Sequence, residues 1–452
     1  MITSEADALK FLLAFEARSV TRILQHTLST CIETDDHHPV HELAIQEELQ
    51  CVSSLSFSVL QSQFLASYVT AATTGSLPFK SVVEYPLPAA AQTHEILPVS
   101  DNLLLISQQT NGALLKVALD DNGRPTGASK WTITNEWSGL HGLTISSKSG
   151  GNSSTSTAWA TVQFDNAILQ IDPKGNDINT APEVIKTIPI PAPAFGPHGI
   201  LEHNGTLWVA CKDSSHVVRI NASDPSDYQI WAVSRRPIFV AVHPTSGDVF
   251  SGLDSSSKIW HYKNDGGNGE EISVPSEKGT TPVGMISGPD GNVWFVLLGG
   301  KTGGTGTFGR INEDATIDYF TMTSNIGATA PVLHLAFGKD PSQLWLLGSS
   351  ISCQTCPDAV YTVTIDNIST GGTAGPRIAK QNTIMLPTQR NWAHRIMFHR
   401  GSLYVSELIT STLAHVTGAA VDGLKVSEPW DQFAVSGLGL GAQVITYNNT
   451  VY

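Results

Sequence analysis

The sequence predicts an all-β protein, a seven-bladed β-propeller preceded by an N-terminal extension. Three observations predict it: a pattern that recurs seven times after residue 76, a spacing of 41 to 60 residues between copies, and short apolar strands separated by Gly, Asp and Asn turns. Four strands per roughly fifty residues is the pattern of a propeller blade, and blades bury their faces by packing around a closed ring. Doubly wound and TIM-barrel folds need long amphipathic helices between strands, and the sequence after residue 76 shows none.

Each copy contains a first strand, a Gly or Asp turn and an apolar or aromatic second strand. In the two clearest copies a histidine precedes the aromatic residue by ten positions, as His198 precedes Trp208 and His394 precedes Tyr404. The stretch SVVEYPLP, residues 81–88, resembles an outer strand but comes before the first copy. We expect it to complete the seventh blade and close the ring.

Residues 1–75 are expected to form an N-terminal extension ahead of the propeller of residues 76–452. Its first apolar residues fit an amphipathic helix, and a second apolar stretch runs from residue 52 to residue 72. That stretch contains several Ser and Gln residues and makes a poor membrane span. Two interpretations stay open: a helical or partly ordered extension, or a signal-like segment behind an upstream start. A secretory address and a cytoplasmic address are therefore both open.

Composition narrows the classes of partner. The formal net charge is −14, and charged residues make up 15% of the chain. This charge disfavours a nucleic-acid groove and an anionic membrane surface, so we expect small-molecule substrates. The five cysteines provide no disulfide framework. Cys353 and Cys356, in the stretch CQTC, suit a small loop disulfide or a free pair better than a zinc site.

The candidate functional site is a ring of histidines. In a propeller the first strand of each blade lines the central channel, so equivalent residues face one mouth. Only 15 of the 452 residues are histidine, yet five of the seven copies have one at this position. Converging imidazoles make a site for substrate binding and proton transfer. The residues expected there are His94, His141, His198, Phe239, Val283, His334 and His394.

A second layer is expected where the second strands end. Three positions after the aromatic residue, the last copy has Glu407, whereas other copies have uncharged residues such as Leu297 and Gly348. A carboxylate beside imidazoles makes an acid/base pair, so His394 and Glu407 are the predicted catalytic residues. Alternatively, Glu407 is a structural partner of a neighbouring histidine. The residues of this layer expected to contact substrate are Gln108, Gln163, Cys211 and Lys212.

The phrases PVGMISGPDGNVWF and FGRINEDATIDYF resemble the blade repeat of the streptogramin B lyases (virginiamycin B lyases), seven-bladed propellers that open a cyclic depsipeptide ester by elimination. The resemblance covers most of residues 80–420. In those lyases a catalytic histidine precedes a glutamate-containing strand in a late blade, which implies these roles for His394 and Glu407. The lyases hold magnesium with glutamates on several strands, where this chain has Leu297, Gly348 and Cys211. We therefore expect no cofactor, with magnesium only if the lyase reaction is retained.

The stretches GGTGTFGRI and LPTQRNWAHR are more similar to a fungal branch of this fold, the hetero-Diels–Alderases of tropolonic sesquiterpenoid biosynthesis. These secondary-metabolism enzymes join a tropolone o-quinone methide to a terpene alkene such as humulene. The resemblance implies a pericyclase that binds its substrate in the channel mouth. A pericyclic step needs a shaped apolar pocket and hydrogen-bond donors. Dehydration to the quinone methide needs an acid/base, which the histidines provide.

Three alternative functions remain open besides the pericyclase. The first is a C–O lyase of the streptogramin lyase type. A gluconolactonase-like lactone hydrolase needs several carboxylate and Asn ligands for its metal, whereas the repeat positions supply histidines and apolar groups. A non-catalytic binding propeller of the WD type is the third, and the WD signature is missing.

Overall fold

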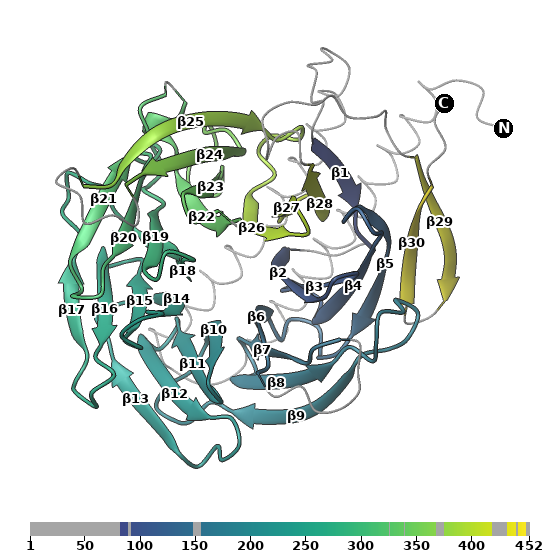
Figure 1. The fold of residues 1–452 in the computed structure, drawn as a ribbon. Helices are drawn as coiled ribbons and strands as arrows, with labels where there is room; N and C mark the ends of the chain where they lie inside the picture. Colours follow the sequence, from purple (N-terminus) through teal and green to yellow (C-terminus); the bar gives the residue numbers. More distant parts are fainter. Residues whose placement is uncertain are drawn as a thin grey trace, which may run out of the picture. The chain divides into compact units, whose positions relative to one another are not determined.

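The blades of the propeller are formed by antiparallel sheets that follow one another along the chain (Figure 1). The computed structural model describes residues 82–88, 92–147, 155–324, 326–338, 340–367 and 375–417, and the strands 432–439 and 442–448. In these ranges there are seven sheets, six with four strands and one with six. The first strand of each sheet contacts the first strands of the sheets on either side, and the seventh contacts the first. The predicted seven-bladed propeller is therefore confirmed, whereas the predicted extension, residues 1–75, lies outside the described residues.

The first four blades take their strands in chain order. Blade 1 contains β2 (Thr93–Ser100), β3 (Leu103–Gln108), β4 (Ala113–Leu119) and β5 (Pro125–Thr132). Blade 2 contains β6 (Leu140–Ile145), β7 (Ala158–Val162), β8 (Ala167–Asp172) and β9 (Glu183–Pro189). Blade 3 contains β10 (Pro197–His203), β11 (Thr206–Cys211), β12 (His216–Asn221) and β13 (Tyr228–Ala232). Blade 4 contains β14 (Pro237–Val242), β15 (Val249–Leu253), β16 (Lys258–Tyr262) and β17 (Glu270–Ser273).

The last three blades include the strand that closes the ring. Blade 5 contains β18 (Pro282–Ser287), β19 (Val293–Leu297), β20 (Thr307–Ile311) and β21 (Ile317–Thr321). Blade 6 follows the 3₁₀ turn η1 (Gly327–Thr329) and contains β22 (Val332–Phe337), β23 (Gln343–Gly348), β24 (Ala359–Asp366) and β25 (Arg377–Met385). Blade 7 contains β26 (Ala393–His399), β27 (Ser402–Glu407), β28 (Thr412–Val416) and β1 (Val82–Pro86).

Strand β1 closes the ring as the sequence predicted. It is the outer strand of blade 7 and pairs with β28 in a register that runs from Val82 opposite Val416 to Pro86 opposite Thr412. Within β1, the side chain of Glu84 accepts hydrogen bonds from the backbone N–H and the hydroxyl of Thr388, at 2.7 and 2.6 Å. The first described strand therefore holds blade 7 and is also bonded to the segment that leaves blade 6.

Two further strands extend blade 1, and the sequence did not predict them. The hairpin of β29 (Gln432–Gly439) and β30 (Ala442–Asn448) adds to the outer edge of β5, with Ala442 opposite Trp131. These strands lack the histidine and turn pattern that identified the blades. They cover an edge that would otherwise present unpaired backbone groups.

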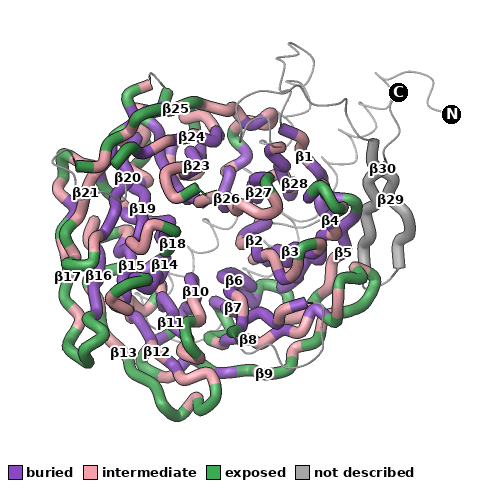
Figure 2. The backbone as a smooth tube through the Cα atoms, viewed as in Figure 1, coloured by how far each residue is buried: buried purple, intermediate pink, exposed green. Residues whose placement is uncertain are grey.

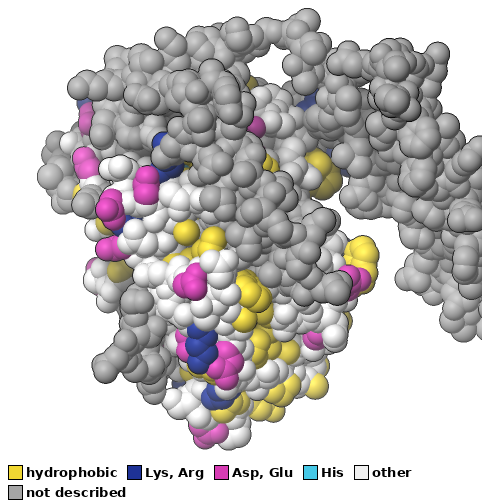
Figure 3. Space-filling model, turned by 90° about the vertical axis from the view of Figure 1, so that its right-hand side faces the viewer, with side chains coloured by type: hydrophobic (Ala, Val, Ile, Leu, Met, Phe, Trp, Pro, Cys, Tyr) yellow, Lys and Arg dark blue, Asp and Glu magenta, His cyan; other side chains and the backbone are white. Residues whose placement is uncertain are grey.

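Burial is greatest in the second strands and least in the outer strands (Figure 2). The second strands β3, β7, β11 and β15 are buried along most or all of their length, whereas the outer strands β13 and β17 are partly or fully exposed. A second strand lies between two neighbouring blades, so both of its faces are covered and its sequence is a continuous apolar run. The outer strands have one face in solvent. On the face shown in Figure 3, acidic, basic and hydrophobic side chains are intermixed on the described residues.

Neighbouring first strands approach so closely that glycine is required after several axial residues. A Cβ on Gly142 would lie 2.5 Å from the carbonyl oxygen of His198, and a Cβ on Gly284 would lie 2.7 Å from the Cα of His334. Real Cβ atoms do not approach that closely, so any larger residue would push the first strands apart. These glycines keep the axial residues of adjacent blades in contact.

The two cysteines of the CQTC stretch form a disulfide, Cys353–Cys356, in the loop between β23 and β24. Of the alternatives that the sequence left open, the structure therefore has the loop disulfide. Cys211 is a free and buried thiol. In the described ranges no helix is long and apolar enough to cross a membrane.

Candidate active site at the propeller axis

Four of the predicted histidines lie in van der Waals contact at the axis. The ring centroids of His394 and His94 are 4.1 Å apart, those of His94 and His141 are 4.0 Å apart, and those of His141 and His198 are 3.7 Å apart. These residues come from the first strands of blades 7, 1, 2 and 3 in turn. The prediction that equivalent histidines converge is confirmed for this arc.

The remaining side of the axis is occupied by Phe239 and His334. The ring of Phe239 lies 6.3 Å from that of His198 and 5.3 Å from that of His334. The guanidinium of Arg395, on blade 7, lies 4.5 Å from the centroid of the Phe239 ring, on blade 4. Blade 7 therefore reaches across the channel to blade 4. Each of the five histidines is between 1% and 7% exposed, so the cluster is nearly dry. The name "axial cluster" is used below for His94, His141, His198, Phe239, His334, His394 and Arg395.

A β-bulge aims the axial residues. In all seven described blades, the register between the first and second strands shifts near the strand's start, for example between Leu140 and Leu143 and between Ala393 and Arg395. A bulge adds a residue to one strand and turns the local side chain away from its regular direction. The shift falls at the axial histidine or next to it in the blades that carry one, so the bulge presents the imidazole to the axis.

Three hydroxyl groups on the second strands hold the backbone of the arc together. Ser406 accepts a hydrogen bond from the backbone N–H of Arg395 at 3.1 Å and donates one to the carbonyl of His94 at 2.6 Å. Ser107 in blade 1 makes the same pair of bonds, to Glu95 N–H and to the His141 carbonyl.

The third member of this series is in blade 2. Thr161 accepts from Gly142 N–H at 2.8 Å and donates to the carbonyl of His198 at 2.7 Å. Each hydroxyl therefore connects the residue after its own blade's histidine to the histidine of the next blade. Blade 3 has Ala210 before Cys211 and lacks this bridge.

Burial keeps all five imidazoles neutral. It lowers the pKa of His94, His141, His198, His334 and His394 well below the usual histidine value, because water no longer stabilises the imidazolium form. The nearby charge of Arg395 lowers all five further, and that of Lys212 lowers three of them. Neutral imidazoles have one proton-accepting nitrogen and one N–H donor, as proton transfer requires.

Several imidazole nitrogens have no hydrogen-bond partner. His94 Nε2 and His141 Nε2 lie 2.9 Å apart, so one of these rings donates its N–H and the other accepts. His198 donates from Nδ1 to the carbonyl of Ile238 at 3.1 Å. By contrast, Nδ1 of His94, His141 and His334 and both ring nitrogens of His394 are buried without a protein partner. Buried polar groups in folded proteins are normally satisfied, so these nitrogens are suited to a bound polar molecule.

The carboxyl group of Glu407 is fully buried near Thr412, Glu84 and Asn391. It accepts a hydrogen bond from the hydroxyl of Thr412, and Glu84 and Asn391 are near enough to influence its ionisation. Burial raises the pKa of Glu407 well above its usual range, and the carboxylate of Glu84 raises it further. Ala393 is opposite Glu407 in the sheet, and no described hydrogen bond joins Glu407 to a histidine. The predicted His394–Glu407 pair therefore has no hydrogen bond in the part of the chain that the structure describes, and a role for Glu407 in catalysis stays a prediction.

Two other residues of the predicted second layer are also inside the blades. Cys211 is buried in the apolar core between blades 2 and 3, and burial raises the pKa of its thiol. Gln108 is opposite Thr93, the same register position that Cys211 has opposite Pro197, and it is fully buried. A substrate contact for Gln108 and Cys211 stays a prediction.

The other two residues of that layer lie at the channel mouth. Lys212 is half-buried, and its positive charge contributes to lowering the pKa of His94, His141 and His198. Burial lowers the pKa of Lys212 itself. Gln163 donates to the carboxylate of Asp213 at 2.9 Å and accepts from Gln109 at 3.3 Å. Gln163 therefore joins the turns of blades 1, 2 and 3.

An ion pair between Arg395 and Glu95, which the sequence did not predict, lies within the cluster. Arg395 is 2% exposed; its Nε donates to Glu95 at 2.9 Å, and its Nη1 donates to the carbonyl of His394 at 3.1 Å. Both Glu95 and Arg395 directly follow an axial histidine in the sequence. The sequence could have indicated this pair, because equivalent positions of two copies carry opposite charges, Glu95 in one and Arg395 in the other. The seventh position, Val283, is buried among Phe239 and Leu333 and contributes an apolar wall.

The cluster does not fit magnesium. This ion prefers six oxygen ligands, whereas the axis presents imidazole nitrogens and an aromatic ring, and the carboxylate of Glu95 is bonded to Arg395. Within the described ranges, no group of three or more His, Cys, Asp or Glu side chains has the arrangement of a metal site.

The rim, defined as the loops at the end of the blades where the first strands begin, carries exposed apolar side chains. Seven large hydrophobic residues are exposed in the described ranges, and five of them are on loops at the end of the blades where the first strands begin. These five are Trp137, Phe164, Phe195, Ile326 and Ile409. Phe164 lies against Gly139 in the loop that carries Trp137, so two of the aromatic residues belong to adjacent loops.

Comparisons with known proteins support the fold. No family model matches the chain, and no curated protein matches its sequence at a significant level. The structure is similar to virginiamycin B lyase from Staphylococcus aureus, with 18% identity, a TM-score of 0.56, and coverage of 74% of this chain and 98% of the lyase. A streptogramin B lyase structure gives 18% identity, a TM-score of 0.55, and coverage of 76% and 99%.

A catalytically inactive variant of virginiamycin B lyase, solved with quinupristin, gives 18% identity, a TM-score of 0.57, and coverage of 74% and 98%. Hydrazine synthase from Kuenenia stuttgartiensis gives 11% identity, a TM-score of 0.56, and coverage of 73% and 97%. Similarity at these identities supports the β-propeller fold alone. The resemblance to fungal hetero-Diels–Alderases stays a prediction.

Proposed function

We propose that the protein is an enzyme that breaks a carbon–oxygen bond in a small, largely apolar organic molecule at the channel mouth. The observation that carries the proposal is the axial cluster, where five neutral imidazoles meet and five ring nitrogens are buried without a protein partner. His394 is the proposed base because both of its ring nitrogens are unpartnered. The propeller similarity to streptogramin B lyases is consistent with this reaction class.

The proposed reaction is an elimination. Neutral His394 takes a proton from a carbon adjacent to the C–O carbon, the C–O bond breaks, and a C=C bond forms. The departing oxygen carries the negative charge, which the ammonium of Lys212 and the guanidinium of Arg395 stabilise. The proton then passes from His394 to this oxygen, so the enzyme returns to its starting state without consuming another reagent.

The rim supports an apolar substrate. Trp137, Phe164 and Phe195 provide exposed aromatic surface on loops at the end of the blades where the first strands begin. Aromatic side chains bind apolar groups by burying area and by stacking. A substrate with an apolar body and one polar group would rest its body on the rim and direct the polar group to the imidazoles.

The second candidate is a hetero-Diels–Alderase that joins a tropolone-type quinone methide to a terpene. The observation that favours it is the combination of the apolar rim with buried, unpartnered imidazole N–H groups. Hydrogen-bond donors in a dry site polarise a diene carbonyl and hold two apolar partners in register. The elimination of water that generates the quinone methide uses the same base, His394, as the lyase reaction.

Two assays on the purified full-length chain test these reactions. Incubation with quinupristin would give a ring-opened product of unchanged mass if the lyase reaction operates. Incubation with a tropolone quinone-methide precursor and humulene would give a cycloadduct if the pericyclic reaction operates. Mass spectrometry separates the products, and conversion in neither assay would contradict the proposal in both forms.

His394→Gln is the decisive variant for whichever reaction is found. Loss of the base would lower kcat by roughly 100-fold or more, the usual size of a general acid/base contribution, while the thermal melting temperature changes little. His415→Gln is the matched control, because His415 is also a buried histidine but lies between Tyr404 and Tyr85, away from the axis. We expect its turnover to be unchanged. EDTA would leave activity intact, and loss of activity with rescue by magnesium would contradict the imidazole-based reaction.

A further inference from the structure

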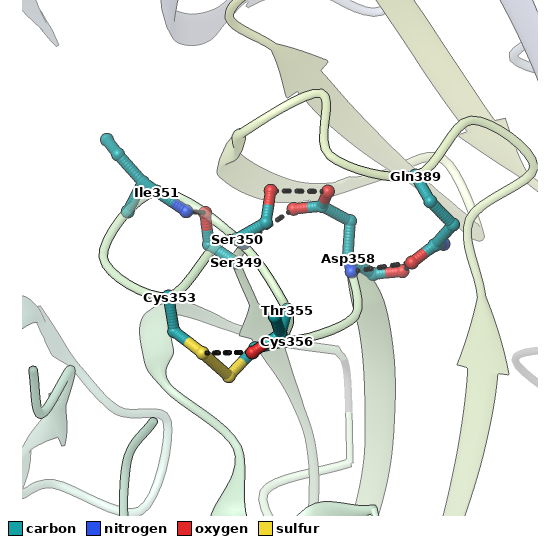
Figure 4. The surroundings of a disulfide bond; sticks show 8 residues. All are labelled: Ser349, Ser350, Ile351, Cys353, Thr355, Cys356, Asp358 and Gln389. Carbon is teal, nitrogen blue, oxygen red and sulfur yellow. Dashed lines mark hydrogen bonds between the residues drawn. A yellow bond between two sulfur atoms is a disulfide. The ribbon is translucent and has the colours of Figure 1, made fainter. Parts of the chain in front are cut away.

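The loop between β23 and β24 lies at the same end of the propeller as the axial cluster. Gly348, the last residue of β23, is opposite Val332, two residues before His334. The loop contains the disulfide Cys353–Cys356, and the backbone N–H of Cys356 donates to the carbonyl of Cys353 at 2.9 Å (Figure 4). The disulfide therefore closes a four-residue turn beside the channel mouth.

Asp358 leaves this turn and binds the segment that leads to His394. Its carboxylate is fully buried. It accepts bonds from the backbone N–H and the hydroxyl of Ser350, both at 2.8 Å (Figure 4). It also accepts from the backbone N–H groups of Asn391 and Ala393, both at 3.0 Å. One carboxylate thus joins the two ends of the disulfide loop to the residue directly before His394.

Gln389 strengthens the same connection. Its side-chain oxygen accepts from the backbone N–H of Asp358 at 3.0 Å, and its side-chain nitrogen donates to the carbonyls of Asp358 and Leu386 at 2.9 and 2.7 Å (Figure 4). The hydroxyl of Ser350 also accepts from Trp392 N–H at 3.4 Å. Residues 389–393 are therefore bound along their length by groups from the disulfide loop.

The backbone of this segment needs such support. Arg390 and Trp392 have φ values of 59° and 56°, in the left-handed region that non-glycine residues rarely adopt. A conformation of this kind persists when surrounding contacts impose it. The contacts that hold this backbone include those of Asp358, Gln389 and Ser350 and the backbone N–H groups of Leu408 and Ile409, which bond to the carbonyls of Trp392 and Asn391. We expect the direction in which His394 leaves the segment to depend on them.

We propose that Asp358 is a positioning residue for His394 and that the Cys353–Cys356 disulfide is a redox latch that keeps Asp358 in place. With the disulfide formed, the loop holds Ser350 and Asp358 together. With the disulfide reduced, residues 353–356 are no longer cross-linked and the loop samples more conformations. Asp358 then loses its hydrogen bonds to Ser350, Asn391 and Ala393. As a result, His394 leaves its position in the axial cluster. This inference rests on the proposed function, because it gives His394 a catalytic role to lose.

The redox step needs a dithiol reductant. Cys356 is partly exposed and lies beside Gly303, whereas Cys353 is buried, so an incoming thiolate attacks the Cys356 sulfur and Cys353 leaves as a thiolate. The second thiol of the reductant then displaces Cys356 and becomes part of the reductant's own disulfide. Two electrons and two protons pass to the protein, which ends with two thiols.

Dithiothreitol tests the latch in the full-length chain through two readouts. The first is the NMR signal of the His394 ring in protein labelled with ¹³C at histidine, assigned by its loss in His394→Gln. The second is kcat and KM in whichever assay shows turnover. Reduction would move the His394 signal and lower kcat by about tenfold, with KM within about twofold, as misplacement of a catalytic group does. The double variant Cys353→Ser, Cys356→Ser would resemble the reduced protein and would not respond to dithiothreitol.

A graded pair of variants tests the positioning role. Asp358→Asn removes an acceptor from a site with four donors, and Ser350→Ala removes only the hydroxyl, so the second variant stays informative if the first does not fold. Each would shift the His394 signal, the first more than the second. Ser342→Ala is the matched control, because Ser342 lies at the other end of β23 and bonds to Asp340. Its signal would be unchanged.

The two readouts separate the two proposals. An unchanged His394 signal after verified reduction, or after Ser350→Ala, would overturn the latch and the positioning role even if the protein is an active lyase. A shifted signal in a protein without turnover in either assay would support the positioning role and contradict the proposed function.

Discussion

At the scale of single residues, the axial cluster is a set of bases that the fold holds without charge. An imidazole in water titrates near neutral pH, whereas here burial and the neighbouring charges of Arg395 and Lys212 oppose protonation. Glu95 balances the charge of Arg395 at 2.9 Å. The imidazoles are thus unprotonated at neutral pH, and the folded protein loses stability at a pH low enough to protonate them.

The acid dependence of stability follows from these pKa shifts. The unfolded chain protonates its histidines below about pH 6.5, whereas the folded axial cluster does not, so the unfolded state gains protons as the pH falls. Each such histidine lowers the free energy of unfolding by about 1.4 kcal/mol per pH unit in this window. Glu407 has a raised pKa and acts in the opposite direction, because its folded form binds a proton more readily. The net expectation is a loss of stability between pH 6.5 and 5.5.

Urea unfolding at several pH values measures this loss. The variant His141→Gln, His198→Gln removes two members of the cluster, so its stability would depend less steeply on pH, by about 3 kcal/mol per unit. His415, whose pKa burial lowers to about 4, is present in both proteins and does not affect the comparison. Equal slopes for the wild type and the variant would contradict neutral burial of these two rings.

At the scale of strands, the position of each imidazole depends on the second strand beside it. Ser107, Thr161 and Ser406 occupy the same register position and bridge successive first strands. The β-bulge at the start of each first strand then directs the side chain to the axis. Spacing in the sequence predicted which residues are equivalent. It did not predict the bulges, because a bulge depends on pairing between strands and leaves no regular spacing.

Thr161→Val tests one hydroxyl bridge with almost no change of shape. The variant loses the acceptor for Gly142 N–H and the donor to the His198 carbonyl, leaving both buried groups unpaired. We expect the free energy of unfolding to fall by roughly 1–3 kcal/mol. We also expect a shift of the His198 ring signal. Ser226→Ala, at an exposed turn of blade 3, is the matched control and would change neither quantity. A Thr161→Val protein as stable as the wild type would contradict the bridge.

At the scale of the whole molecule, closure of the ring brings together residues from both ends of the propeller. Strand β1 completes blade 7, and in the closed ring His394 of blade 7 and His94 of blade 1 are neighbours. The sequence predicted the number of blades, this closure and the convergence of the histidines. All three follow from a repeat that cannot bury its faces alone.

Other features of the whole molecule were beyond the sequence. The direction in which Glu407 and Cys211 point depends on which face of the second strand meets the previous blade, and spacing along one strand does not reveal it. The role of Arg395 was not predicted because its partner, Glu95, is 300 residues away in the sequence and becomes a neighbour only in the closed ring. The hairpin of β29 and β30 was missed because it lacks the blade pattern.

The most direct test of the account is a pH titration of the histidine ring signals, by NMR, in the wild type and in His394→Gln. We expect His94, His141, His198, His334 and His394 to stay neutral well below pH 6.5, and we expect removal of His394 to shift the signal of His94. Titration of all five near the ordinary histidine value, together with a His94 signal indifferent to His394→Gln, would contradict the axial cluster.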